Sequence, residues 1–99
     1  MELGKVVGTV VATRKDEGLK GRKIQVVNLV NCDMSATGEF VVAVDTVGAG
    51  VGEVVLVVRG SSARVTTGMS AVPVDACIVA ILDSVEIQGK RVFDKARDL

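Results

Sequence analysis

The stretch Val44-Asp45-Thr46-Val47-Gly48-Ala49-Gly50-Val51-Gly52-Glu53 decides how the fold is interpreted. Its glycines follow the pattern G-x-G-x-G, whereas a dinucleotide-binding loop needs G-x-G-x-x-G leading from a strand into a helix. Glu53 stands where the last of those glycines would be, and Val54–Val58 is typical of a strand rather than a helix. The stretch therefore predicts a structural turn, in which the missing side chains allow another backbone to come close.

Valine-rich runs lie on both sides of this turn. We expect Phe40–Val47 and Glu53–Arg59 to form a strand pair across it. Both runs are almost wholly apolar, which indicates burial on two faces rather than one face exposed to water.

Further strand signals are spread along the chain. Leu3–Ala12 predicts a long strand bending at Gly4 or Gly8, and the other strands are expected at Lys23–Leu29 and Ala76–Val85. A short helix is expected around Ala63 and Arg64, capped by a preceding serine. Glu86–Phe93 predicts a terminal hairpin turning at Gln88-Gly89, and the charged tail Asp94–Leu99 is expected to fray. This pattern is typical of an all-β protein with a small β-barrel, formed by residues 1–99 as a single domain.

The composition favours self-association. Hydrophobic residues make up 48% of only 99 residues, although aromatic residues make up 2%. A small domain buries a limited share of its surface, so part of this apolar surface is expected to pack against other copies. A tightly packed valine core in a monomer is the alternative that composition leaves open.

Charge and cysteine content exclude several classes of partner. Twelve basic and twelve acidic residues balance, so the chain offers no general electropositive surface for nucleic acid. The sequence has no run of about 18 apolar residues, so it predicts no membrane span. The residues Met1–Lys5 lack the basic and apolar regions of a secretory signal. Cys32 and Cys77 match no metal or redox spacing, which fits a reducing, cytoplasmic location.

The sequence lacks several of the side chains that enzymes commonly use for catalysis. The chain has no histidine, tyrosine or tryptophan, which rules out Ser-His-Asp and Cys-His systems within it. Paired carboxylates at Asp45, Asp75 and Asp83 could in principle do acid–base or metal work. We expect them instead to pair with arginines such as Arg59 and Arg64, or to accept backbone N–H bonds at turns. The sequence thus predicts no enzyme, no metal and no cofactor.

Several segments together resemble the EutN/CcmL family, the pentameric vertex proteins of bacterial microcompartments. They are Leu3–Lys15, Ala43–Glu53, Gly60–Arg64, and the run from Pro73 to Val85. The match covers nearly the whole chain, in order and at family-like spacing. The resemblance implies an OB-like, five-stranded closed β-barrel that assembles into a five-fold ring.

The same resemblance implies a structural role. Such a homopentamer would cap the vertices of a polyhedral shell in the cytoplasm, where hexameric shell proteins form the facets and encapsulated enzymes are further partners. No nucleic acid, membrane or catalysed reaction is implied. The alternative is a small OB-like binding module, either for single-stranded nucleic acid or as an adaptor to cargo enzymes.

The candidate site residues follow from the matching motifs and belong to the subunit interface or the five-fold axis. Glycines and small residues would let backbones approach, the charged residues would neutralise one another, and the serines would cap the short helix. The candidates are Asp45, Gly48, Ala49, Gly50, Val51, Gly52, Glu53, Arg59, Ser61, Ser62 and Arg64.

Overall fold

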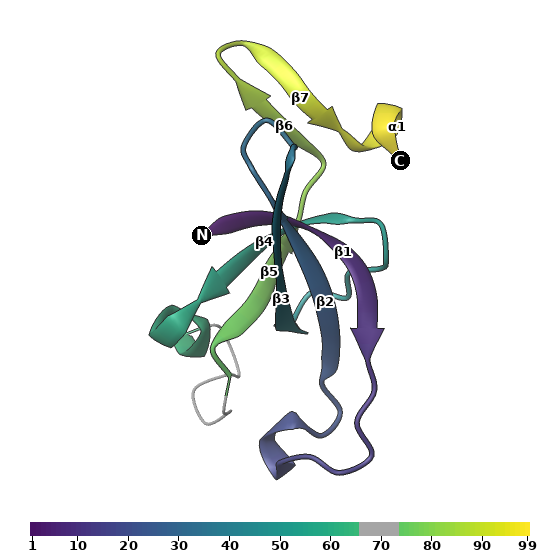
Figure 1. The fold of residues 1–99 in the computed structure, drawn as a ribbon, viewed down its shortest axis with the longest axis vertical. Helices are drawn as coiled ribbons and strands as arrows, with labels where there is room; N and C mark the ends of the chain where they lie inside the picture. The colour runs from purple at the N-terminus through teal and green to yellow at the C-terminus, as the bar shows by residue number, and fades with distance from the viewer. Residues whose placement is uncertain (66–73) are drawn as a thin grey trace.

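The computed structural model of the chain describes residues 1–65 and 74–99, except for the side chains of Ser62 and Arg64. Its strands and helices, including the 3-10 helices η1 and η2, follow in this order: β1 (Glu2–Val10), η1 (Glu17–Leu19), β2 (Lys23–Val30), β3 (Ala36–Asp45), β4 (Val54–Arg59), η2 (Gly60–Val65), β5 (Ala76–Ile81), β6 (Ser84–Ile87), β7 (Lys90–Asp94) and α1 (Lys95–Asp98). The mainly-β prediction is confirmed, and the short helix expected around Ala63 forms as η2 (Figure 1).

Five strands close into a barrel in the order β1-β2-β3-β5-β4, with β4 paired back to β1. All neighbours are antiparallel except β3 and β5, which run parallel. The predicted five-stranded closed barrel is therefore confirmed. The predicted terminal hairpin also forms, as a separate sheet of β6 and β7 that projects from one end of the barrel (Figure 1).

The strand pair expected across the glycine turn is wrong. β5 lies between β3 and β4 in the barrel, so the loop at residues 46–53 crosses over a strand instead of closing a hairpin. Thr46 begins this crossing, because its backbone N–H and its Oγ1 both donate to the carbonyl oxygen of Ile78 on β5, at 3.3 and 2.8 Å. At the other end, Gly52 and Glu53 exchange backbone hydrogen bonds with Val6 on β1. The glycine loop thus joins two strands that never pair with each other.

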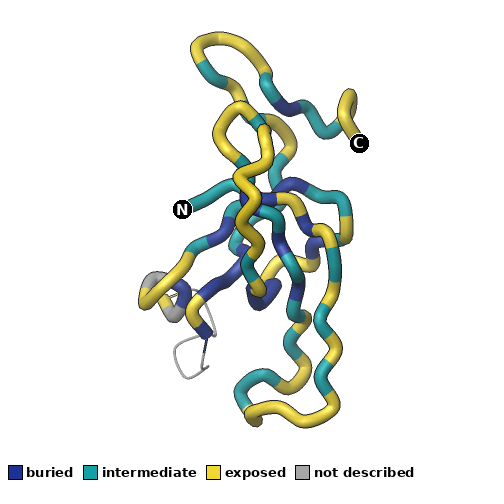
Figure 2. The backbone as a smooth tube through the Cα atoms, in the orientation of Figure 1, coloured by how far each residue is buried: buried dark blue, intermediate teal, exposed yellow. Residues whose placement is uncertain are grey.

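The expected burial of both valine-rich runs is correct for most of β4 and wrong for both ends of the run Phe40–Val47. Val54, Val55 and Val57 are buried on β4. In the run Phe40–Val47, by contrast, Phe40 and Val42 are exposed, and burial begins only at Ala43 (Figure 2). The reason is topological: β5 pairs with β3 only at Val44 and Asp45. An apolar sequence alone does not reveal how far a distant strand extends along its neighbour.

The C-terminal part differs from the sequence prediction in two places. The run Ala76–Val85 is divided, because β5 ends at Ile81 and β6 begins at Ser84. The tail does not fray fully: Asp94 caps α1, with its Oδ1 accepting the backbone N–H of Ala96 at 3.0 Å. The hairpin turn lies where predicted, at Gln88 and Gly89, which have φ angles of 52° and 79°.

The core lies inside the barrel and depends on alternation along the strands. On β2, Gln25, Val27 and Leu29 point inward and are buried, while the residues between them are partly exposed. β1 bends as predicted at Gly8, where its register with β2 shifts after Val6. A second buried cluster, formed by Val44, Ala63, Val74 and Cys77, packs η2 against the barrel.

Gly4 lies where the packed barrel leaves no room for a side chain. A Cβ atom there would collide with Cγ1 of Val27 and lie 3.3 Å from the backbone oxygen of Asn28. We expect Gly4→Ala to lower the free energy of unfolding by about 1–3 kcal/mol, because the packed barrel must shift. Gly8→Ala is the matched control, since its nearest atom would lie 3.7 Å away. Urea unfolding of both variants measures the difference, and equal stability would contradict the close-packing account.

Candidate functional site

The side chain of Asp45 fixes the start of the glycine loop at residues 46–53 by hydrogen bonds. The carboxylate of Asp45, on a side chain at the buried end of β3, accepts backbone N–H bonds from Val47 and Gly48 at 2.9 and 3.0 Å. Gly48 and Gly52 have φ angles of 75° and 96°, a region that side-chain-bearing residues rarely adopt. The expectation that Asp45 accepts backbone bonds at a turn is therefore confirmed, and the loop conformation requires glycine at these two positions.

Gln25 is the main residue that the sequence prediction missed. Its fully buried Nε2 donates to the backbone oxygen of Ala49 at 2.7 Å and to Oδ2 of Asp45 at 3.3 Å. Its Oε1 accepts from Oγ1 of Thr9 at 3.0 Å, so the buried amide is satisfied on both sides. Nζ of Lys23 also donates to the oxygen of Ala49, at 2.9 Å. The centre of the glycine loop is thus fixed to β2 by these polar contacts.

Glu53 closes the loop and links it to the tail. Its Oε1 accepts the backbone N–H of Gly50 at 2.7 Å, and its Oε2 pairs with Nζ of Lys95 at 2.7 Å. The hydrogen bond from Lys95, followed by the one from Gly50, lowers the pKa of Glu53 below its ordinary value of 4.5. The same pair raises the pKa of Lys95. One carboxylate therefore fixes the loop and anchors the C-terminal segment to the barrel.

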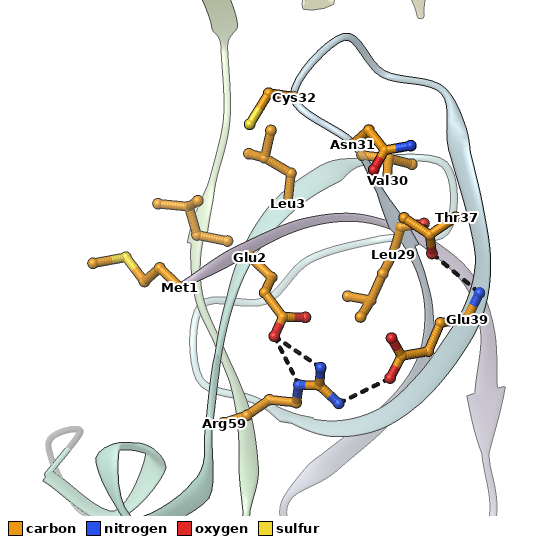
Figure 3. Close-up of a pocket in the computed structure, with 11 residues that line it drawn as sticks. Met1, Glu2, Leu3, Leu29, Val30, Asn31, Cys32, Thr37, Glu39 and Arg59 are labelled. Carbon is orange, nitrogen blue, oxygen red and sulfur yellow. Dashed lines mark hydrogen bonds and ion pairs between the residues drawn. The ribbon is translucent and has the colours of Figure 1, made fainter.

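Arg59 lies at the other end of β4 and bridges two strands (Figure 3). Its Nε and Nη2 donate to Oε1 of Glu2 on β1 at 2.9 and 2.8 Å, and its Nη1 donates to Oε2 of Glu39 on β3 at 3.0 Å. These three side chains border a cavity of about 430 Å³ whose lining includes Leu3, Leu29 and Leu56. The ion pairs span the opening between β3 and the β1–β4 pair.

The predicted site residues divide into two groups. Asp45, Gly48, Ala49, Gly50, Val51, Gly52 and Glu53 form one continuous surface feature, in which Val51 is exposed and Ala49 is buried. Arg59 and Ser61 are separated from this loop by the six-residue strand β4, with Arg59 at its far end and Ser61 in η2. The expected serine cap is wrong, because η2 begins at Gly60 and therefore includes both Ser61 and Ser62. The side chains of Ser62 and Arg64 lie outside the described part of the structure.

Within the subunit, the three charged candidates whose side chains are described pair with other residues and not with one another, and their mutual neutralisation across a subunit boundary stays a prediction. Asp45 bonds to loop amides and Gln25, Glu53 pairs with Lys95, and Arg59 pairs with Glu2 and Glu39. The partners Glu2, Glu39 and Lys95 come from strands and a tail that no short sequence motif connects. Each of these three charges is satisfied within the subunit.

Neither a metal-binding cluster nor a reactive thiol is found in the described residues. In residues 1–65 and 74–99, no three His, Cys, Asp or Glu side chains gather as a metal site. Burial raises the pKa of the Cys77 thiol, which disfavours its reactive thiolate form, and Cys32 is exposed. Among the described helices, none has the length and apolarity to cross a membrane. The fold and this loop define a small β-barrel protein in which the side chains of Asp45 and Gln25 hold a surface loop in place.

The chain belongs to the EutN/CcmL family. The family model described as "Ethanolamine utilisation protein EutN/carboxysome" matches residues 1–83. Among relatives, the shell vertex protein GrpN of Rhodospirillum rubrum is 51% identical over 86 residues, covering 87% of this chain and 97% of GrpN. The carboxysome shell vertex protein CcmL of Synechococcus elongatus is 45% identical over 95 residues, covering 96% of each chain.

Solved structures agree with the fold. CcmL of Gloeobacter violaceus superposes with a TM-score of 0.92 at 36% identity, covering 97% of this chain and 99% of that one. A structure described as the GrpN pentameric microcompartment shell protein superposes with a TM-score of 0.81 at 49% identity, covering 88% and 99%. The resemblance drawn from the sequence motifs is confirmed.

The pairing of Glu53 with Lys95 predicts a pH dependence. Folding lowers the pKa of Glu53 below its ordinary value of 4.5. The charged Glu53 side chain therefore stabilises the folded state fully above pH 4.5, and this stabilisation is lost as the pH falls through the lowered pKa of the folded protein. We expect the melting temperature of wild type to exceed that of Glu53→Gln near neutral pH, and the gap to narrow below pH 4.5. Glu86→Gln, at an exposed position on β6, is the control. Melting curves from about pH 3 to 7 test this, and a constant gap would contradict the role of the Glu53 charge.

Proposed function

We propose that this protein is a structural shell protein, not an enzyme, which forms a homopentamer and caps the vertices of a polyhedral bacterial microcompartment in the cytoplasm. The observation that carries the proposal is its 49% identity, over 88% of its length, to a protein whose solved structure is described as pentameric. Relatives across the family are named as shell vertex proteins, both of carboxysomes and of other microcompartments.

The physical features of the subunit suit this role. A sheet of hexagonal units is flat, and five-fold units give it the curvature that closes a shell. A ring of five is made by a heterologous contact, in which two different surfaces of one subunit meet their counterparts on its two neighbours. The chain carries no net charge at neutral pH, which removes long-range repulsion between copies.

Partners beyond the chain itself are part of the same proposal. Hexameric shell proteins would surround the pentamer, and the encapsulated enzymes would lie on its inner side. Residues 1–99 would act as one domain, because the Glu53–Lys95 pair ties the C-terminal segment to the barrel. No nucleic acid or membrane enters the assembly.

The glycine loop is our candidate contact surface, at the subunit boundary or near the five-fold axis. It exposes Val51 and Val47 to solvent at 66% and 39%, while its backbone is fixed by Asp45 and Gln25. A loop held in one conformation loses little entropy when it is covered, which favours binding. Arg59, Ser61, Ser62 and Arg64 would form a second contact at the far end of β4.

Native mass spectrometry tests the assembly. We expect a dominant five-subunit species at low micromolar concentration for wild type. Gly50→Leu should lose it, because a leucine side chain on the proposed contact loop would collide with the neighbouring subunit. Within the subunit, Gly50 is half-buried and has no left-handed φ, and a Cβ there would make an ordinary 3.5 Å contact with Oε1 of Glu53. The subunit thus has room for a Cβ atom at this position.

Gly50→Ala is the control and should keep the ring. A pentameric Gly50→Leu variant would remove the loop from the interface without affecting the proposed ring. A wild-type monomer at every concentration would contradict the proposed function and favour the small binding module.

A further inference from the structure

The first half of β3 is a strand without a second neighbour. It pairs with β2 along its length, but β5 reaches it only at Val44 and Asp45, so in the described chain residues 36–43 have one free edge. Phe40 and Val42 on this segment are 59% and 55% exposed. Natural edge strands are usually protected against pairing with another chain by a lysine, by a proline or by a covering element. Residues 36–43 contain no lysine and no proline.

The second half of β1 has a free edge too. β1 pairs with β4 from Glu2 to Lys5, and the glycine loop continues this contact as far as Val6. Beyond Val6, β2 is the single strand neighbour of β1 among the described elements. Val7 and Val11 are 43% and 90% exposed there, and no regular element follows until η1 at Glu17.

The two edges carry opposite charges. At the β3 edge, Glu39 and Glu2 share the single guanidinium of Arg59, which leaves one negative charge. The segment after β1 carries Arg14 and Lys15, both exposed. The side chain of Lys15 makes a local bond, to the backbone oxygen of Ala12 at 2.9 Å. The segment Val7–Lys15 thus ends in two basic residues, directly before the exposed Asp16 and Glu17. An acidic, apolar edge and an apolar segment with two basic residues are therefore present on the same chain.

We propose that the free edge of β3 pairs with the segment from Val7 to Lys15 of a second copy of this chain. Phe40 and Val42 would pack against Val7 and Val11 of that copy, and Glu39 would face Arg14. This inference rests on the proposed ring and specifies its subunit contact.

The contact has the properties that a ring requires. The two edges are different surfaces, so the contact is heterologous and repeats around an axis instead of ending at a dimer. An extended segment of nine residues spans about 30 Å, enough to cover the open half of β3. Strand addition satisfies the free backbone groups while the alternate side chains give specificity. The glycine loop borders the same contact, because Gly52 and Glu53 bond to Val6 directly before the free part of β1.

A charge-swap cycle tests the pairing directly. Glu39→Arg and Arg14→Glu should each raise the concentration at which the ring dissociates by about tenfold, because each places like charges together. The double variant should recover most of this loss, because exchanging the two side chains restores a pair of opposite charges across the contact. Sedimentation velocity over a dilution series measures the ring, and circular dichroism checks that each variant is folded.

A second pair of variants tests the apolar part of the contact without changing any charge. Phe40→Ser should weaken the ring by a similar factor, whereas Val65→Ser, at an 86% exposed position at the end of η2, should not. A wild-type ring that none of these variants weakens would overturn the strand pairing while leaving the pentamer intact. A wild-type monomer would instead overturn the proposed function itself.

Discussion

The fold depends on the insertion of β5 between β3 and β4. Because β5 runs parallel to β3 and meets it only at Val44 and Asp45, the chain must cross from β3 to β4 over the end of the barrel. The glycine loop is the segment that makes this crossing. Among the described strands, the same short contact leaves the first half of β3 with a neighbour on one side only, where Phe40 and Val42 are exposed. A closed barrel and an incomplete strand edge thus have one cause.

Buried polar groups turn the crossing into a fixed surface. Asp45 holds the loop amides, Gln25 holds the carbonyl of Ala49, and Glu53 holds Gly50 while it pairs with Lys95. Leaving the fully buried amide of Gln25 unpaired would cost about 1–3 kcal/mol, so the network favours a single loop conformation. The charges that border the loop are satisfied within the subunit, which leaves apolar contact and backbone pairing as the main means of assembly there. Assembly by apolar contact and backbone pairing suits a structural protein of a shell.

The sequence predicts features that depend on neighbouring residues. The turn at Gln88 and Gly89, the bend at Gly8 and the backbone bonds of Asp45 all involve partners within a few positions or an intrinsic backbone preference. The strand order could not be predicted in this way, because the β3–β5 contact joins Val44 to Cys77, far apart in the chain. The Glu53–Lys95 pair and the Glu2–Arg59–Glu39 bridge have the same origin. Gln25 did leave a signal: its period-two spacing with Val27 and Leu29 places an amide on the core face of β2.

The central claim is that each barrel is completed by its neighbours along a free strand edge. Backbone amide hydrogen exchange at residues 37–43 tests it most directly, measured on the wild-type ring and on a diluted or Phe40→Ser monomer. The account predicts that free-edge amides in this segment exchange much more slowly in the ring, at rates comparable to those of β2. Equal exchange of these amides in the assembled and dissociated protein would contradict it.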